Sequence, residues 1–87
     1  MRSNLGGLIM KFNQELIDEL NILIQYDLSN TEQGIKIHHD ASPATIDAAA
    51  RLFDKGLIDK KDGGYLTSIG RKAAEHTLSI SGLLTTD

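Results

Sequence analysis

The residues best suited to binding a metal ion are His38, His39 and Asp40, which follow one another directly. Neighbouring residues on an extended chain point to opposite sides, so the two imidazoles do not readily share one ion. Protein zinc sites generally use three or four nitrogen, sulfur or oxygen ligands. The only other histidine is His76, and the chain has no cysteine. We therefore predict no metal site and no cofactor.

Nucleophilic catalysis has no recognisable basis in this sequence. An activated serine or threonine needs a base within hydrogen-bonding distance, and no motif places one beside a histidine. The pair Gly63–Gly64 follows Asp62, and Asp-Gly is a strong signal for a hairpin turn with positive φ at both central residues. We interpret these glycines as turn residues rather than as a phosphate loop. The sequence predicts a binding protein and not an enzyme.

Charged residues are divided unevenly between the two halves of the chain. The net charge is −3, but residues 51–72 hold six bases against three acids, whereas residues 11–32 hold one base against five acids. Arg51, Lys55, Lys60 and Lys61 could neutralise several phosphates of a nucleic acid. The alternative is a solvated surface on which Asp54, Asp59 and Asp62 balance these bases.

Length and composition predict one small domain. The chain has 87 residues, and a domain of this size buries a modest core, which dimerisation would enlarge. The absence of cysteine fits a reducing compartment, and no apolar run approaches the ~18 residues of a membrane span. We predict a cytoplasmic protein. Met10 resembles a second start, so we expect residues 1–9 to be a mobile extension and residues 10–87 to form the domain.

The first helix is predicted to begin near Asn13, a good N-cap residue. Its expected buried face repeats with helical spacing, and Ile22 falls on the opposite, polar side as a candidate partner contact. That buried face comprises Leu16, Ile17, Leu20, Leu23 and Ile24. Residues 31–41 are ambiguous: 31–34 could begin a short second helix, but Gly34 is costly there. We favour a turn of helix or irregular chain over 30–34, followed by extended chain over 35–38.

The helix over residues 42–55 has the clearest boundaries. Ser42 is a good N-cap, Pro43 suits the first helical position, and Gly56 suits the left-handed residue that closes a helix. Its expected inward side comprises Ile46, Ala49, Ala50, Phe53 and Leu57.

Two short strands, 57–60 and 65–67, should form a hairpin through residues 61–64. Thr67 or Ser68 should cap a last helix, which Gly82 could end early. Its expected apolar stripe comprises Ile69, Ala73, Thr77, Ile80 and Leu84.

The run from Ser42 to Ile58, followed by a hairpin and by Gly64-Tyr-Leu-Thr-Ser-Ile-Gly-Arg71, resembles winged helix-turn-helix regulators of the MarR and PadR types. The likeness covers about residues 42–76. The chain from Met10 also resembles a small family of uncharacterised bacterial proteins, some of which carry a DNA-binding label. The resemblance implies a mostly α, α+β winged-helix-like fold: helix, irregular or short strand, recognition-like helix, β-hairpin wing and C-terminal helix.

By the same resemblance, helix 42–55 would enter the major groove of double-stranded DNA and hairpin 59–62 would contact the backbone, as in a transcription-related protein. Ala44, Asp47 and Ala48 suit base reading poorly, which leaves Arg51 as the strong donor to a base edge. The residues implied to contact DNA are Thr45, Arg51, Lys55, Lys60, Lys61, Arg71 and Lys72.

The alternative function is a protein-interaction or dimerisation module without nucleic acid. Regulators of this type usually dimerise through terminal helices, and the end of this chain is apolar. The candidate interaction surface comprises Ile22, Ile80, Leu83 and Leu84. Fold alone does not choose between DNA and a protein partner.

Overall fold

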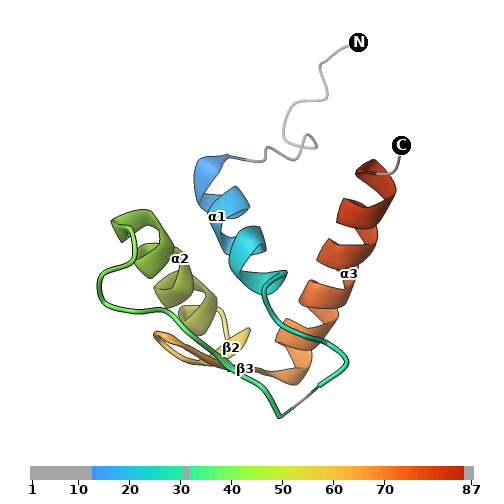
Figure 1. Ribbon diagram of the computed structural model, residues 1–87. Helices are drawn as coiled ribbons and strands as arrows, with labels where there is room; N and C mark the ends of the chain where they lie inside the picture. Colours follow the sequence, from blue (N-terminus) through green and yellow to red (C-terminus); the bar gives the residue numbers. More distant parts are fainter. Residues whose placement is uncertain (1–12, 31, 86–87) are drawn as a thin grey trace.

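A computed structural model describes residues 13–30 and 32–85. These residues form an α+β fold in which helices predominate (Figure 1). The elements follow the predicted order of helix, short strand, helix, hairpin and helix. They are α1 (Gln14–Leu23), β1 (Ile35–Lys36), α2 (Pro43–Asp54), β2 (Ile58–Lys60), β3 (Gly63–Leu66) and α3 (Ser68–Leu84). The predicted extension, residues 1–9, lies outside the described residues.

Helix α1 begins where the sequence predicts, but it buries a different face. Asn13 Oδ1 accepts a hydrogen bond from the Leu16 backbone N–H at 2.9 Å, as expected of an N-cap. Ile22, predicted to lie exposed, is only 1 % exposed and belongs to the core, so its place in the interaction surface was wrong. Ile17 and Ile24, predicted inward, are exposed. The buried series is Glu19, Ile22, Leu23 and Tyr26, and the pattern was missed because its first member is an acid.

The segment between α1 and α2 contains a strand and, in its described part, no second helix. Strand β1 pairs antiparallel with β3, placing Ile35 opposite Gly64 and Lys36 opposite Gly63. The backbone N–H of Ile37 donates to Asp62 O at 2.7 Å and extends this contact. Extended chain is confirmed at Ile35–Lys36, and the described residues of 30–34 form no helix.

Helix α2 has the predicted boundaries. Ser42 Oγ accepts from the Thr45 backbone N–H at 3.2 Å. At the other end Gly56 has a φ of 80°, and the N–H groups of Gly56 and Leu57 donate to Phe53 O and Leu52 O, each at 3.0 Å. These two bonds form a Schellman motif, which ends the helix at a glycine.

The inward face of α2 is shifted by one residue from the prediction. Ala48, Ala49 and Leu52 are buried, whereas Ile46 and Phe53 are exposed. One residue corresponds to a rotation of about 100° about the helix axis. Ala48, predicted to face DNA, is 0 % exposed. The rotation places Arg51 and Lys55 beside Glu19 of α1.

The hairpin forms as predicted, with different turn residues. Gly63 and Gly64 have φ values of 126° and 73°, while no other described residue except Gly56 has positive φ. Lys61–Asp62 therefore makes the turn, and the predicted Asp62–Gly63 centre was wrong. Ile58 pairs with Leu66 and Lys60 with Gly63, so two residues of β3 oppose the single residue Asp59. β3 is the central strand, in the order β1-β3-β2.

Helix α3 begins at the predicted cap, where Thr67 Oγ1 accepts from the Gly70 N–H at 3.1 Å. It continues past Gly82 to Leu84, so Gly82 does not end it. Its buried residues are Gly70 and Ala74, in its first two turns, and the predicted inward residue Ile69 is exposed. From there α3 runs away from the sheet (Figure 1).

Tyr26 connects the core to the hairpin and makes the stability of the fold depend on pH in the alkaline range. Its hydroxyl donates to Gly64 O at 3.1 Å. Burial, and secondarily the charge of Asp59, raises the pKa of Tyr26 to about 12 from 10.0. Because the folded pKa is the higher one, this stability is complete below pH 10.0 and is lost as the pH rises through about 12.

We expect Tyr26→Phe to remove the alkaline loss of stability that comes from ionisation of the Tyr26 hydroxyl. This loss amounts to about 3 kcal/mol for a shift of two pKa units. Urea unfolding followed by circular dichroism on both sides of the range measures it. Tyr65→Phe, at an exposed tyrosine, is the matched control and should keep the wild-type pH dependence. An alkaline loss of equal size in Tyr26→Phe would contradict the assignment.

Candidate functional site

Two of the predicted DNA-binding bases form ion pairs with one buried carboxylate, that of Glu19. Glu19 Oε2 accepts from Arg51 Nε at 2.7 Å, and Glu19 Oε1 accepts from Lys55 Nζ at 2.5 Å. Arg51 Nη2 also donates to Glu15 O at 3.0 Å. Burial raises the pKa of Glu19, but the hydrogen bonds and charges of Lys55 and Arg51 outweigh it and hold the pKa below 4.5. Arg51, the expected base reader, therefore faces α1.

The remaining predicted DNA contacts do not join these bases in one cluster. Thr45 is half-buried, and its hydroxyl lies 2.9 Å from Ser42 Oγ. Arg71 donates to Leu28 O, and its Nε lies 3.6 Å from Glu75 Oε2. Lys72 is exposed on α3.

Lys60 and Lys61 are exposed at the hairpin, and neither forms an ion pair within residues 13–30 and 32–85. Of the predicted bases, these two have the arrangement best suited to contacting phosphate.

The outer side of α2 offers little to a base edge. Its exposed residues include Ile46, Asp47, Phe53 and Asp54, two of them apolar and two acidic. Acids repel the phosphate backbone, and apolar side chains read little beyond the thymine methyl group. These four residues therefore give base reading by α2 little chemical support.

A groove between α1 and α3 is lined mainly by apolar side chains. It has a volume of about 440 Å³, and Leu16, Ile17, Leu20 and Ile24 line it from α1 while Ile80 and Leu84 line it from α3. No lysine, arginine, aspartate or glutamate lines it, although His76 does. Leu84 is 79 % exposed, and Leu83, which does not line the groove, is 78 % exposed. The predicted residues Ile80, Leu83 and Leu84 are thus exposed.

Sequence reasoning missed the α1 wall of this groove. Helix α1 carries apolar residues on two sides, and the prediction assigned one of them to the core. The sequence did indicate a second apolar side, because Ile22 is a large apolar residue that lies outside the predicted buried stripe. A helix with two apolar sides has two surfaces to cover. Here Ile22 and Leu23 face the core, while Ile17 and Ile24 face the groove.

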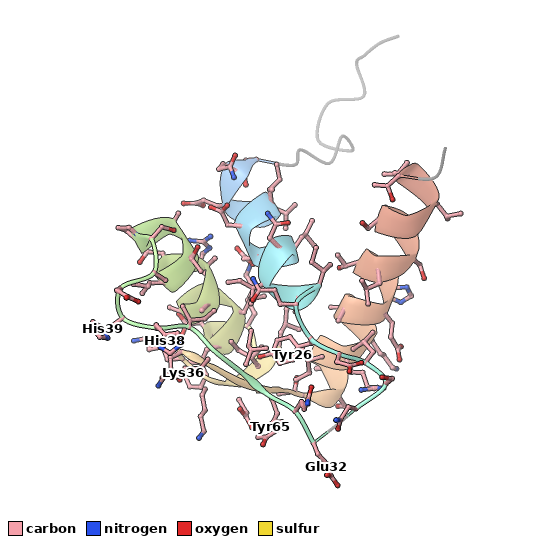
Figure 2. All side chains as sticks on the ribbon, in the orientation of Figure 1. Tyr26, Glu32, Lys36, His38, His39 and Tyr65 are labelled. Carbon is pink, nitrogen blue, oxygen red and sulfur yellow. The ribbon has the colours of Figure 1, made fainter. Side chains whose placement is uncertain are left out.

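Two other kinds of site were sought in the described residues. None of their helices has both the length and the apolar character needed to cross a membrane. They also contain no group of three or more histidine, cysteine, aspartate or glutamate side chains placed to hold a metal ion. His38 and His39 are exposed on the loop before α2 (Figure 2).

Comparison with known proteins identifies a family without a known activity. Residues 10–85 match the family of unknown function DUF5669, and the chain belongs to that family. No curated protein matches the chain. No solved structure matches it either.

Proposed function

We propose that the protein is an interaction module that acts as a homodimer, in which two copies bury their α1–α3 grooves against each other. The observation that carries this proposal is the second half of α3. After Ala74 none of the remaining residues of α3 through Leu84 is buried, yet they include Leu78, Ile80, Leu83 and Leu84. A helical segment this short is marginal by itself in water, so packing must stabilise it.

A second copy is the occupant that best fits the charge of the surface. No lysine, arginine, aspartate or glutamate lines the groove, so these surfaces can approach each other without repulsion between such side chains despite the net charge of −3. Stable homodimer interfaces are more apolar than ordinary surface, and their centres are depleted in charge. The contact would also enlarge the small core of this domain.

The hypothesis that α2 reads duplex DNA stays a prediction. The ion pairs of Arg51 and Lys55 with Glu19, and the exposed Asp47 and Asp54, give it less support than the groove gives dimerisation.

Ile80→Glu combined with Leu84→Glu is expected to convert the dimer to monomer. Removing an anchor at the centre of an interface costs about 2–4 kcal/mol, so the dissociation constant should rise by roughly 30- to 1,000-fold. Sedimentation equilibrium over a range of concentrations measures this change. Both side chains are exposed, so the variant should still unfold cooperatively, and any loss of helical circular dichroism should be limited to the second half of α3.

Ile69→Glu is the matched control, since Ile69 is an exposed residue of the same helix outside the groove. This control should remain dimeric. A wild-type protein that is monomeric at the highest measurable concentration, or a control that dissociates as readily as the double variant, would overturn the proposal.

A further inference from the structure

The sheet has an open side that the dimer would leave free. The helices lie on one side of the sheet, and Figure 2 shows Lys36 and Tyr65 on the other side. Burial alternates along β1 as expected for a sheet with one covered side, since Ile35 is half-buried, Lys36 is exposed and Ile37 is buried. An exposed lysine and an exposed aromatic residue therefore share one face.

This face is hollowed at its centre. The hollow has a volume of about 390 Å³, and Lys36, Lys60 and Tyr65 surround it together with Gly34 and Gly64. A Cβ added at Gly34 would lie 2.6 Å from Gly64 O and 3.4 Å from Tyr65 Cδ1, so the two glycine segments are in close contact. Because glycine has no side chain, the Tyr65 ring lies beside the backbone of these two residues. Tyr65 is 45 % exposed, in a chain with four aromatic residues.

Two cations, Lys36 and Lys60, and one acid, Asp62, line the hollow. Lys36 Nζ lies 2.5 Å from Asp62 Oδ2, with side chains 64 % and 46 % exposed. Exposed pairs of this kind contribute little to stability, so Lys36 can exchange Asp62 for a phosphate. Asp59 is held by the Tyr65 backbone N–H, which donates to its Oδ1 at 2.8 Å. Lys60 is exposed and forms no ion pair among the described residues, so the lining carries one more positive charge than negative charge.

We infer that the open face of the sheet binds single-stranded nucleic acid, with one base stacked on Tyr65 and neighbouring phosphates on Lys36 and Lys60. An aromatic ring between cations is the arrangement that binds single strands with little sequence preference. A single strand exposes the flat faces of its bases, whereas a duplex keeps them stacked and offers mainly phosphate. The inference is independent of the dimer, because none of these residues lines the α1–α3 groove.

The test uses a fluorescein-labelled oligothymidylate of about ten nucleotides and full-length protein, with fluorescence anisotropy as readout. Tyr65→Ala should weaken binding roughly 5- to 150-fold, the value of one stacked base, whereas Tyr65→Phe should bind like the wild type. With two phosphates neutralised, log affinity should fall with log salt at a slope of roughly −1.4. Lys36→Ala with Lys60→Ala should flatten that slope.

Lys72→Ala, which removes an exposed cation from α3, is the matched control and should leave affinity and slope unchanged. Circular dichroism establishes that each variant is folded. Equal binding by Tyr65→Ala and wild type would overturn the inference, as would a wild type that shows no binding. Tighter binding to a duplex of the same length, unaffected by Tyr65→Ala, would also overturn it and would indicate contact with phosphate alone.

Discussion

Gly70→Ala is expected to destabilise the protein by about 3 kcal/mol, although alanine is the better helix former. A Cβ at Gly70 would overlap the carbonyl group of Leu57, and all three atoms nearest to it are backbone atoms. That backbone has little freedom to move, because the Leu57 N–H donates to Leu52 O at 3.0 Å and Leu57 O accepts from the Thr67 N–H at 3.1 Å. The new methyl group must therefore push α3 away from the end of α2.

Thermal unfolding followed by circular dichroism measures this effect, which should lower Tm by roughly 10–20 °C in a domain of this size. Gly82→Ala makes the same substitution in the same helix at a position where a Cβ meets nothing within 4 Å. This control should keep or raise Tm, because the higher helix propensity of alanine adds at most about 1 kcal/mol to the free energy of unfolding. Equal Tm values for the two variants would show that α3 does not approach Leu57 as closely as described.

Glu19→Gln is expected to cost about 2 kcal/mol at neutral pH, because it removes the charge that two bases share while keeping the shape of the side chain. The folded pKa of Glu19 is lowered from 4.5, since Lys55 and Arg51 outweigh the effect of burial. A lowered pKa gives stability that is present above pH 4.5 and lost as the pH falls through the folded value. The difference between wild type and Glu19→Gln should therefore disappear in acid.

Urea unfolding at neutral and acidic pH tests this expectation, with Glu15→Gln as the control. Glu15 is an exposed acid of the same helix, and its contact with Arg51 uses its backbone oxygen rather than its carboxylate. The control should match the wild type at both pH values. A cost for Glu19→Gln that is the same at both pH values would mean that packing, rather than charge, makes Glu19 important.

Features encoded by local sequence could be predicted from the sequence. The cap at Ser42, the proline after it and the left-handed Gly56 act within a few residues of each other, and α2 has the predicted ends. The hairpin and β1 were predictable for similar reasons. The turn differed by one residue because two consecutive glycines permit more than one placement of positive φ.

Features that depend on partners distant in sequence could not be predicted. Glu19 is buried only because Arg51 and Lys55 arrive from α2, 32 and 36 positions away. Treating Glu19 as a surface residue rotated the expected core face of α1 and placed Ile22 outside. The same contact pairs Arg51 and Lys55, two of the predicted DNA contacts, with an acid. The exposure of Ile80, Leu83 and Leu84 was easier to predict, because a terminal apolar segment has few neighbours that could cover it.

The direction of α3 has a consequence for how two copies would work together. The helix starts beside the sheet and carries the apolar groove residues Ile80 and Leu84 away from it (Figure 1). Copies joined through those ends would hold their two open sheet faces apart rather than side by side. A single-stranded nucleic acid long enough to reach both sheet faces would gain avidity from the second attachment, whereas a short one would not. Strand length would then select the target where base sequence does not.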